Sequence, residues 1–361
     1  MTIKANNYLE EIISYKPGKS KIGLSDAIKL SANENALGCS PKVQEAYKNI
    51  AQDIWRYSDG SCTKLRETIA NKYNLNAEQI VCGAGSDELI ALLTQGFCQK
   101  EDEIIYSHHG FLMYPISAKR VGAKAVRAAE QDLKTDINAI INSITEKTKI
   151  IFIANPNNPT GSYLTKDEIY RLIELTPKNI LIVFDHAYDE FVTNKDYPKD
   201  ILKLVAKNDN IVITRTFSKI YGLASLRVGW CYGSKYVADI LNKIRGPFNV
   251  SGPAQISAIA ALQDNEFLEK SIEHNSKWLK IYFDSLVQNT NFKIHKSVGN
   301  FVLIDFFDKN NCDKANIELQ NKNIMVREMS SYDLISALRI TIGNNQENEM
   351  VISELQNFIR L

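Results

Sequence analysis

The chain has 361 residues, of which 44% are hydrophobic and 24% are charged, as is ordinary for a globular protein. This length is too great for one ordinary core, so we expect one large and one smaller domain. The 43 basic and 42 acidic side chains leave a formal net charge of +1. Such a balance provides no overall field that would collect nucleic acid or an anionic membrane.

The six cysteines are scattered and form no CxxC pair, which indicates reduced thiols rather than a disulfide framework or a zinc site. The first nine residues lack the apolar core of a signal peptide. No apolar run reaches the ~20 residues needed to cross a bilayer. His108 and His109 have no third ligand at a suitable spacing, so we expect no metal site. These features predict a soluble cytoplasmic protein.

The chain pattern divides into three parts. Residues 1–35 are irregular and read as an N-terminal arm with a segment of the small domain. Residues 36–255 alternate short apolar runs with amphipathic helices, which predicts a large α/β domain whose mostly parallel sheet is flanked by helices. Residues 256–361 begin with a long helix, near 266–288, and then read as a smaller α+β domain.

Three apolar runs in the large domain read as buried parallel strands, at 149–154, 180–184 and 210–214. Between the first two, Thr165 and Glu168 have the spacing of a helix capping box. Ligands of open α/β sheets bind beyond the carboxyl ends of the strands. All three runs end in polar residues, so we expect the functional site at this edge of the sheet.

The polar residues at these strand ends are chemically complementary. Asn158 begins an Asn-Pro-Thr-Gly turn, and Asp185 begins the segment Asp-His-Ala-Tyr, which ends at Tyr188. Lys219 closes the segment Thr-Phe-Ser-Lys, and Arg227 follows eight residues later. A lysine amine, a carboxylate, hydrogen-bond donors and a cationic cradle are the groups that a pyridoxal phosphate site requires.

A glycine-containing turn supplies a further element of such a site. The segment from Gly83 to Glu88 precedes an apolar helix, so its backbone amides point toward a potential anion. A nucleotide-binding interpretation of this turn fails because neither the P-loop spacing nor a complete GxGxxG is present.

The motifs Asn-Pro-Thr-Gly, Asp-x-Ala-Tyr and Ser-Lys-x7-Arg occur in this order over residues 158–227. Together they resemble the fold-type I aminotransferases of the aspartate aminotransferase superfamily. The resemblance implies that Lys219 carries pyridoxal 5′-phosphate and moves a proton between substrate Cα and cofactor C4′. It also implies that Asp185 pairs with the ring nitrogen, and that Asn158 and Tyr188 bind the ring oxygen O3′.

The same resemblance implies the rest of the cofactor site. Phe111 aligns with the aromatic residue that stacks on the ring. The other expected cofactor-binding residues lie in the turn at 83–88 and in the segment 216–227: Gly85, Ser86, Asp87, Thr216, Ser218 and Arg227.

Four further segments, at residues 15–18, 31–35, 56–59 and 338–343, resemble the histidinol-phosphate aminotransferase family. In that family the tyrosine that matches Tyr57 reaches the cofactor phosphate of the neighbouring subunit, which implies a homodimer with shared active sites. The resemblance makes Tyr15, Asn33, Arg327 and Arg339 substrate-binding residues. Tyr15 and the two arginines would hold a substrate phosphate, and Arg339 would also take the carboxylate of glutamate or 2-oxoglutarate.

Several positions depart from the family pattern. Ala36 and Ser58 stand where prolines are common, His109-Gly110 replaces Pro-Thr before the aromatic residue, and Ile220 follows the lysine in place of a small residue. None of these changes removes a chemical group from the expected site. They leave the substrate less certain than the cofactor.

The leading hypothesis is therefore amino-group transfer between L-histidinol phosphate and 2-oxoglutarate. One alternative keeps the chemistry with aromatic amino acids, and another is the decarboxylation performed by threonine-phosphate decarboxylases. A transcriptional regulator is disfavoured because the site begins within the first sixty residues, which leaves no room for a DNA-binding domain. Simpler structural roles remain open for some residues: Phe111 in the core, Tyr57 and Tyr15 on the surface, and Arg327 and Arg339 in salt bridges.

Overall fold

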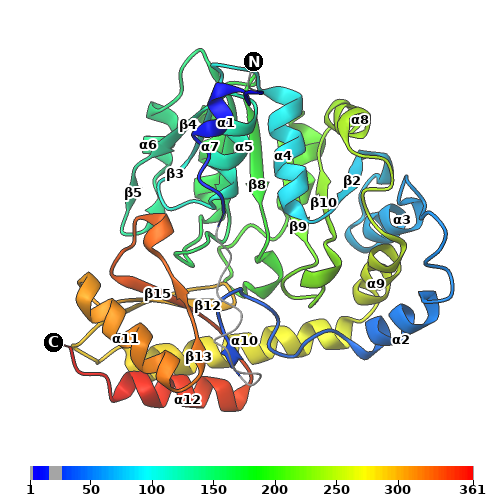
Figure 1. Ribbon diagram of the computed structural model, residues 1–361. Helices are drawn as coiled ribbons and strands as arrows, with labels where there is room; N and C mark the ends of the chain where they lie inside the picture. The colour runs from blue at the N-terminus through cyan, green and yellow to red at the C-terminus, as the bar shows by residue number, and fades with distance from the viewer. Residues whose placement is uncertain (1–2, 16–26, 361) are drawn as a thin grey trace.

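The computed structural model describes residues 3–15 and 27–360, and its centre is a seven-stranded sheet (Figure 1). Only β10 runs antiparallel to its neighbours, and the other adjacent pairs are parallel. The mostly parallel sheet predicted from sequence is thereby confirmed. In spatial order the strands are β2 (Ile80–Gly83), β10 (Gly229–Tyr232), β9 (Ile211–Thr216), β8 (Leu181–Asp185), β7 (Thr148–Ala154), β3 (Glu103–Ser107) and β4 (Lys124–Ala128).

The three apolar runs became the central strands β7, β8 and β9, with ends that differ from the expected ones by at most two residues. Every residue of β8 and β9 is buried. Strands covered on both faces are apolar at successive positions rather than alternating ones. Burial on both faces explains why these three strands could be recognised in the sequence as continuous apolar runs.

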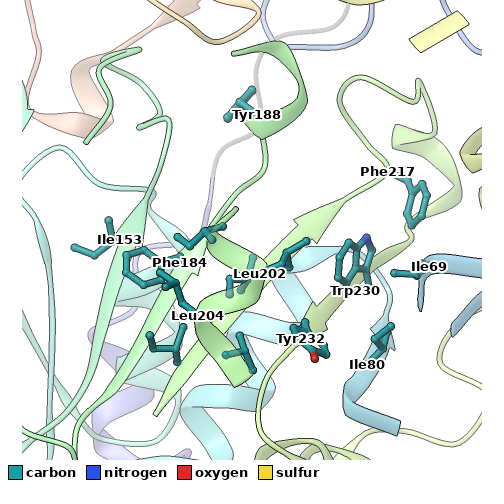
Figure 2. Packing of buried hydrophobic residues seen from close by; sticks show 14 of the residues in the cluster. Ile69, Ile80, Ile153, Phe184, Tyr188, Leu202, Leu204, Phe217, Trp230 and Tyr232 are labelled. Atoms are coloured by element: carbon teal, nitrogen blue, oxygen red, sulfur yellow. The ribbon is translucent and has the colours of Figure 1, made fainter. Parts of the chain in front are cut away.

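Helices cover both faces of the sheet. Ile182 and Phe184 belong to one core, shown in part in Figure 2, whereas Leu181 and Val183 belong to the core on the opposite face. The first core packs against α2 (Pro41–Ile50), α3 (Thr63–Tyr73), α6 (Ile137–Asn142), α7 (Lys166–Leu175) and α9 (Gly252–Leu262). The second packs against α4 (Ser86–Phe97), α5 (Met113–Arg120) and α8 (Lys235–Ile244).

The expected capping box of α7 is confirmed. The Thr165 hydroxyl accepts from the Glu168 backbone N–H, and the Glu168 carboxylate accepts from the Thr165 N–H. These two bonds satisfy donors at the helix start that have no partner within the helix. The helix therefore begins at Lys166, twelve residues after Ala154 at the site-bearing end of β7.

A second unit contains a four-stranded antiparallel sheet and three helices (Figure 1). Its strands are β11 (Lys293–His295), β12 (Phe301–Asp305), β15 (Ala337–Thr341) and β14 (Arg327–Glu328), and its helices are α10 (Asn265–Leu286), α11 (Lys309–Asn321) and α12 (Asn345–Gln356). From near the N-terminus, β1 (Ile28–Lys29) pairs with β13 (Ile324–Met325), and Leu30 enters this core. Residues 28–30 therefore pack with the C-terminal part of the chain.

The chain passes from the core of the large domain to the core of the smaller unit within α10. Ala258 and Leu262 of α9 pack in the large core, whereas Trp278 and Leu286 of α10 pack in the smaller one. The boundary expected at 255/256 falls inside α9, so we propose that the domains meet in α10 instead. Among residues 3–15 and 27–360, no helix is both long enough and apolar enough to cross a membrane.

Candidate active site

A cavity of about 350 Å³ opens at the carboxyl ends of β7, β8 and β9, between the large domain, residues 29–33 and β15. It brings together most of the residues expected from sequence: Tyr15, Asn33, Ser86, Asp87, Phe111, Asn158, Asp185, Tyr188, Thr216, Ser218, Lys219, Arg227 and Arg339. These residues come from segments up to about three hundred positions apart in the chain, so only the fold makes them neighbours.

Lys219 follows β9 and extends into this cavity. Its Nζ donates to the Ala32 carbonyl at 3.1 Å and lies 5.7 Å from the centre of the Tyr188 ring. Burial, with the positive charges of Arg339 and Arg227, lowers the pKa of Lys219 to about 8. A larger fraction of the amine is therefore neutral near neutral pH than in an exposed lysine, and the neutral amine is the nucleophile.

Asp185 is the last residue of β8, and both of its carboxylate oxygens are hydrogen-bonded. The Tyr114 hydroxyl donates to Oδ2 at 2.9 Å, and the Thr214 hydroxyl donates to Oδ1 at 3.1 Å. Burial raises the pKa of Asp185 to about 6, although these two bonds and the charge of Lys219 oppose the rise. A cation opposite this carboxylate would stabilise its ionised form.

Sequence reasoning missed Tyr114 and Thr214. Thr214 lies beside Asp185 in the register of β8 and β9, so its side chain points to the same side of the sheet. Aligning the two predicted strands would have revealed it. Tyr114 lies three residues after Phe111, and its ring stacks on Phe152 with centroids 4.7 Å apart. Only the assembled fold shows that its hydroxyl reaches Asp185.

An anion cradle lies at the start of α4. Gly85, with φ +86°, precedes the first turn, and a Cβ at this position would lie 2.5 Å from Arg227 Nη2. Arg227 donates from Nη1 to the Ser218 hydroxyl at 3.3 Å, and its Nη2 lies 3.5 Å from Asp87 Oδ2. A helix N-terminus beside a guanidinium and hydroxyls is suited to a phosphate. Glycine suits this position because its φ of +86° would strain any other residue and because a side chain would displace Arg227.

Two amides and an arginine organise the opposite wall. Arg339 Nη1 donates to Asn158 Oδ1, and Arg339 Nη2 donates to the Ser31 carbonyl at 3.0 Å. Asn33 Nδ2 donates to the Tyr188 hydroxyl at 2.9 Å. Arg339 Nε is buried without a hydrogen-bond partner. An orphaned guanidinium donor beside the cavity fits the binding of an acidic oxygen.

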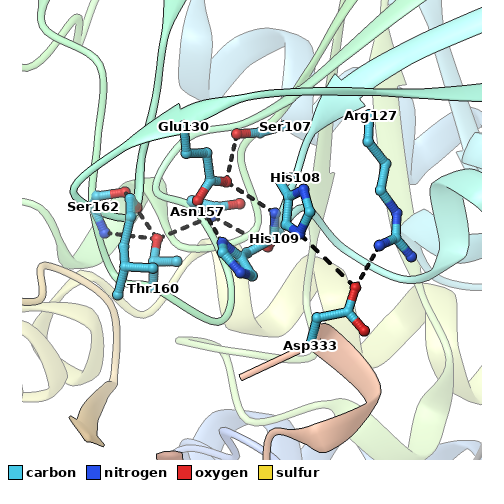
Figure 3. Close-up of polar contacts among 10 residues, drawn as sticks. Ser107, His108, His109, Arg127, Glu130, Asn157, Thr160, Ser162 and Asp333 are labelled. Atoms are coloured by element: carbon cyan, nitrogen blue, oxygen red, sulfur yellow. Dashed lines mark hydrogen bonds and ion pairs between the residues drawn. The ribbon is translucent and has the colours of Figure 1, made fainter. Parts of the chain in front are cut away.

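The loop that carries Phe111 into the cavity is held by Glu130 (Figure 3). Its carboxylate accepts from the Ser107 hydroxyl at 2.6 Å and from the His109 backbone N–H at 3.0 Å, and it contacts His109 Nδ1 at 2.6 Å. Asn157, next to Asn158, donates to the His109 carbonyl at 3.4 Å. The His-Gly departure from the family pattern therefore has a structural role, since the imidazole anchors the loop.

Besides Gly85, which lies behind the cavity at the start of α4, two expected residues are not among those that line the cavity of a single chain. The Tyr57 side chain is 85% exposed and stacks on Phe248, with ring centres 4.6 Å apart. Arg327 is adjacent to Arg339 across β14 and β15, and its guanidinium lies 5.8 Å from the Tyr15 ring centre. Lys16, Pro17 and Gly18 of the motif at 15–18 lie outside the described residues.

A larger cleft, of about 1060 Å³, lies between α7 and α10 and contains none of the expected site residues. Several polar groups of its lining bond to one another, as Lys134 does with Glu168 at 2.6 Å and Tyr163 with Asp196 at 2.9 Å. The cavity at the strand ends therefore remains the candidate active site.

The fold and this cavity define an aminotransferase of class I or II, and the sequence matches that family over residues 25–355. The chain is 42% identical to a curated histidinol-phosphate aminotransferase from Maricaulis maris, with complete coverage of both chains. It therefore belongs to the histidinol-phosphate aminotransferase family.

Solved structures agree with this fold. A histidinol-phosphate aminotransferase from Sinorhizobium meliloti, in complex with pyridoxal-5′-phosphate, superposes with a TM-score of 0.89 at 23% identity, over 99% of this chain and 98% of that one. An aspartate aminotransferase from Thermus thermophilus gives a TM-score of 0.80 at 19% identity, over 92% of each chain. The fold class expected from sequence is confirmed.

Pyridoxal 5′-phosphate is the cofactor of this class, and the cavity fits it chemically. The absence of a Cβ at Gly85 leaves space beside Arg227, and this space suits a bound phosphate. The buried Asp185 carboxylate forms no direct ion pair with the residues that the structure describes, and a protonated ring nitrogen would supply one. Lys219 provides an amine of lowered pKa for the aldehyde.

We expect the attachment of pyridoxal phosphate to the apoenzyme to speed up as pH rises through about 8, because deprotonation of Lys219 generates the nucleophile. Arg339→Gln removes a positive charge that lowers the pKa of Lys219, so the pH midpoint of the attachment rate should be higher in this variant. Arg339→Lys keeps the charge and should keep the lower midpoint. Stopped-flow absorbance in the visible range measures the rate. An identical midpoint in all three proteins would contradict the electrostatic explanation.

Proposed function

We propose that this protein transfers the amino group of L-histidinol phosphate to 2-oxoglutarate, forming imidazole acetol phosphate and L-glutamate in histidine biosynthesis. The observation that carries the proposal is the convergence of Lys219, Asp185, Asn158, Arg227 and Arg339 on one cavity. Identity of 42% to a curated relative over the complete chain supports the substrate.

In this proposal, the bound cofactor supplies an electron sink that stabilises negative charge at the substrate Cα. Lys219 would hold the cofactor through its aldehyde, and its free amine would accept the Cα proton of the substrate and return it at C4′. Tyr114 and Thr214 fix the two oxygens of Asp185, which would pair with the ring nitrogen of the cofactor. Asn158 and Tyr188 would donate hydrogen bonds to the ring oxygen.

The substrate would be held by cations on the small-domain side. Arg339, with its unpartnered Nε, suits the carboxylate of glutamate or 2-oxoglutarate and also a substrate phosphate. Arg327 and Tyr15 lie together beside it, as the binding of a phosphate requires. Two guanidinium groups suit a dianion better than a monoanion.

Two alternatives differ in substrate or in reaction. An aromatic amino acid aminotransferase would use the same lysine, but it would leave the paired arginines without a dianion. A threonine-phosphate-type decarboxylase would keep the phosphate site and would release carbon dioxide without needing a 2-oxo acid. Both are tested by the same substrate panel.

We further propose a homodimer with shared active sites. Large apolar side chains are exposed in one region: Ile54, Trp55 and Tyr57 in one loop and Phe248 beside them. Exposed apolar surface of this kind is typical of a protein interface. Tyr57, which lies outside the cavity of its own chain, would reach the cofactor phosphate of the partner. A cytoplasmic location is also proposed, supported by six free cysteines.

With 2-oxoglutarate as acceptor, we expect kcat/KM for L-histidinol phosphate to exceed that for phenylalanine by at least about tenfold, because paired arginines select a phosphate. Lys219→Ala should abolish both turnover and the visible absorbance of the bound cofactor. Preference for phenylalanine would favour the aromatic alternative. Carbon dioxide release in the absence of a 2-oxo acid would favour the decarboxylase.

Shared active sites predict complementation between two inactive variants. Tyr57→Ala and Lys219→Ala chains, mixed and reassembled, should recover roughly a quarter of wild-type activity, since half of the dimers are mixed and each has one intact site. Mixing two batches of Lys219→Ala provides the control. If the mixture stays as inactive as its parts while mixed dimers are present, Tyr57 does not serve the partner's site.

A further inference from the structure

Every polar atom of Asn33 already has a protein partner. Its backbone N–H donates to the Thr341 hydroxyl at 2.9 Å, and its carbonyl accepts from Asn300 at 3.0 Å. Its side-chain oxygen accepts from the same Thr341 hydroxyl at 3.2 Å, and its amide nitrogen donates to Tyr188 at 2.9 Å. Asn33 is 1% exposed. This arrangement does not suit the direct substrate contact that was expected from the sequence.

The orientation of the Asn33 amide follows from the hydroxyl of Thr341. That hydroxyl accepts from the Asn33 backbone N–H, so its own proton needs an acceptor, which Asn33 Oδ1 provides. The reversed amide would leave a buried hydroxyl proton without a partner, at a residue that is 3% exposed. The amide nitrogen must therefore face Tyr188.

The direction of this bond constrains Tyr188 in turn. Because Asn33 Nδ2 can only donate, the Tyr188 oxygen accepts and its own proton is free to be donated elsewhere. Burial raises the pKa of Tyr188, so the phenol keeps that proton at neutral pH. Tyr188 lines the cavity, where the expected acceptor is an anionic ring oxygen.

We propose that Asn33 is a positioning residue that holds the Tyr188 hydroxyl as a hydrogen-bond donor toward the ring oxygen of the cofactor. This role rests on the proposed function and replaces direct substrate binding by Asn33. Asn158 is oriented in the same way, because Arg339 donates to its Oδ1 and leaves its Nδ2 available to the cavity.

Asn33 also connects this hydroxyl to the strand that carries Arg339. Thr341 lies two residues after Arg339 on β15, and both side chains are buried. The link runs from β15 through Thr341 and Asn33 to Tyr188 in the large domain. A substitution of Thr341 or Asn33 should therefore change how the Tyr188 hydroxyl is oriented, although neither residue would contact the cofactor.

The readout is the pH midpoint of the visible absorbance of the lysine-bound cofactor. A donor to the ring oxygen draws electron density from it, so the adjacent nitrogen of the lysine linkage holds its proton less tightly. Loss of the donor should raise the midpoint. For Tyr188→Phe we expect a rise of about one pH unit, and for Asn33→Ala a smaller rise in the same direction.

The decisive test is a double-mutant cycle with Asn33→Ala and Tyr188→Phe. If Asn33 acts through Tyr188, the double variant has the midpoint of Tyr188→Phe alone, and Asn33→Ala lowers kcat with less than about a twofold change in KM for the amino donor. Additive shifts of the midpoint would overturn the proposal. So would a rise in KM with an unchanged midpoint, which is the result expected of a substrate ligand.

Thr341 supplies a matched pair that leaves Asn33 in place. Thr341→Ser keeps the hydroxyl that orients the amide and should keep the wild-type midpoint, whereas Thr341→Val removes it and should shift the midpoint upward. An equal midpoint in the two Thr341 variants would overturn the proposal. This test also works if Asn33→Ala fails to fold, and thermal melting of the apoenzyme shows whether that variant is folded. If wild-type protein gains no visible band with pyridoxal phosphate, the proposed function itself has failed.

Discussion

The buried carboxylate of Asp185 is the group on which the arrangement of this site depends. Burial raises its pKa to about 6, so its ionised form is less favourable than that of an exposed carboxylate. Tyr114 and Thr214 each supply one hydrogen bond, and a protonated ring nitrogen would add a positive charge beside it. Because β8 ends at this residue, the position of the carboxylate fixes where the ring must lie. The lysine, the phosphate cradle and the donors then occupy the remaining sides.

The groups that face the cavity are oriented by groups behind them. Arg339 donates to Asn158, and Asn33 donates to Tyr188, so each of the two front residues is left with a donor for the site. A buried hydrogen-bond network is favourable when all its members are satisfied. The orphaned Nε of Arg339 is an exception, and it lies where an acidic substrate is expected. Binding of substrate would complete the network.

Much of this could be predicted from the sequence because it depends on local pattern. Strands β7 to β9 are continuous apolar runs, and the ordered motifs around Asn158, Asp185 and Lys219 identified the cofactor. Residues whose roles depend on distant partners could not be predicted. Tyr114 reaches a carboxylate 71 positions away, and Asn33 is held by a hydroxyl 308 positions away. No sequence period or spacing encodes such contacts.

Residues 31–33 are an integral part of this site. The Ser31 carbonyl accepts from Arg339, the Ala32 carbonyl accepts from Lys219, and the Asn33 amide donates to Tyr188. Three consecutive residues thus bond to three side chains that come from two different domains. The pairing of β1 with β13 positions this segment, so the lysine and the arginine find these partners only when the strand of the small domain is in place. The active site therefore depends on groups from both domains.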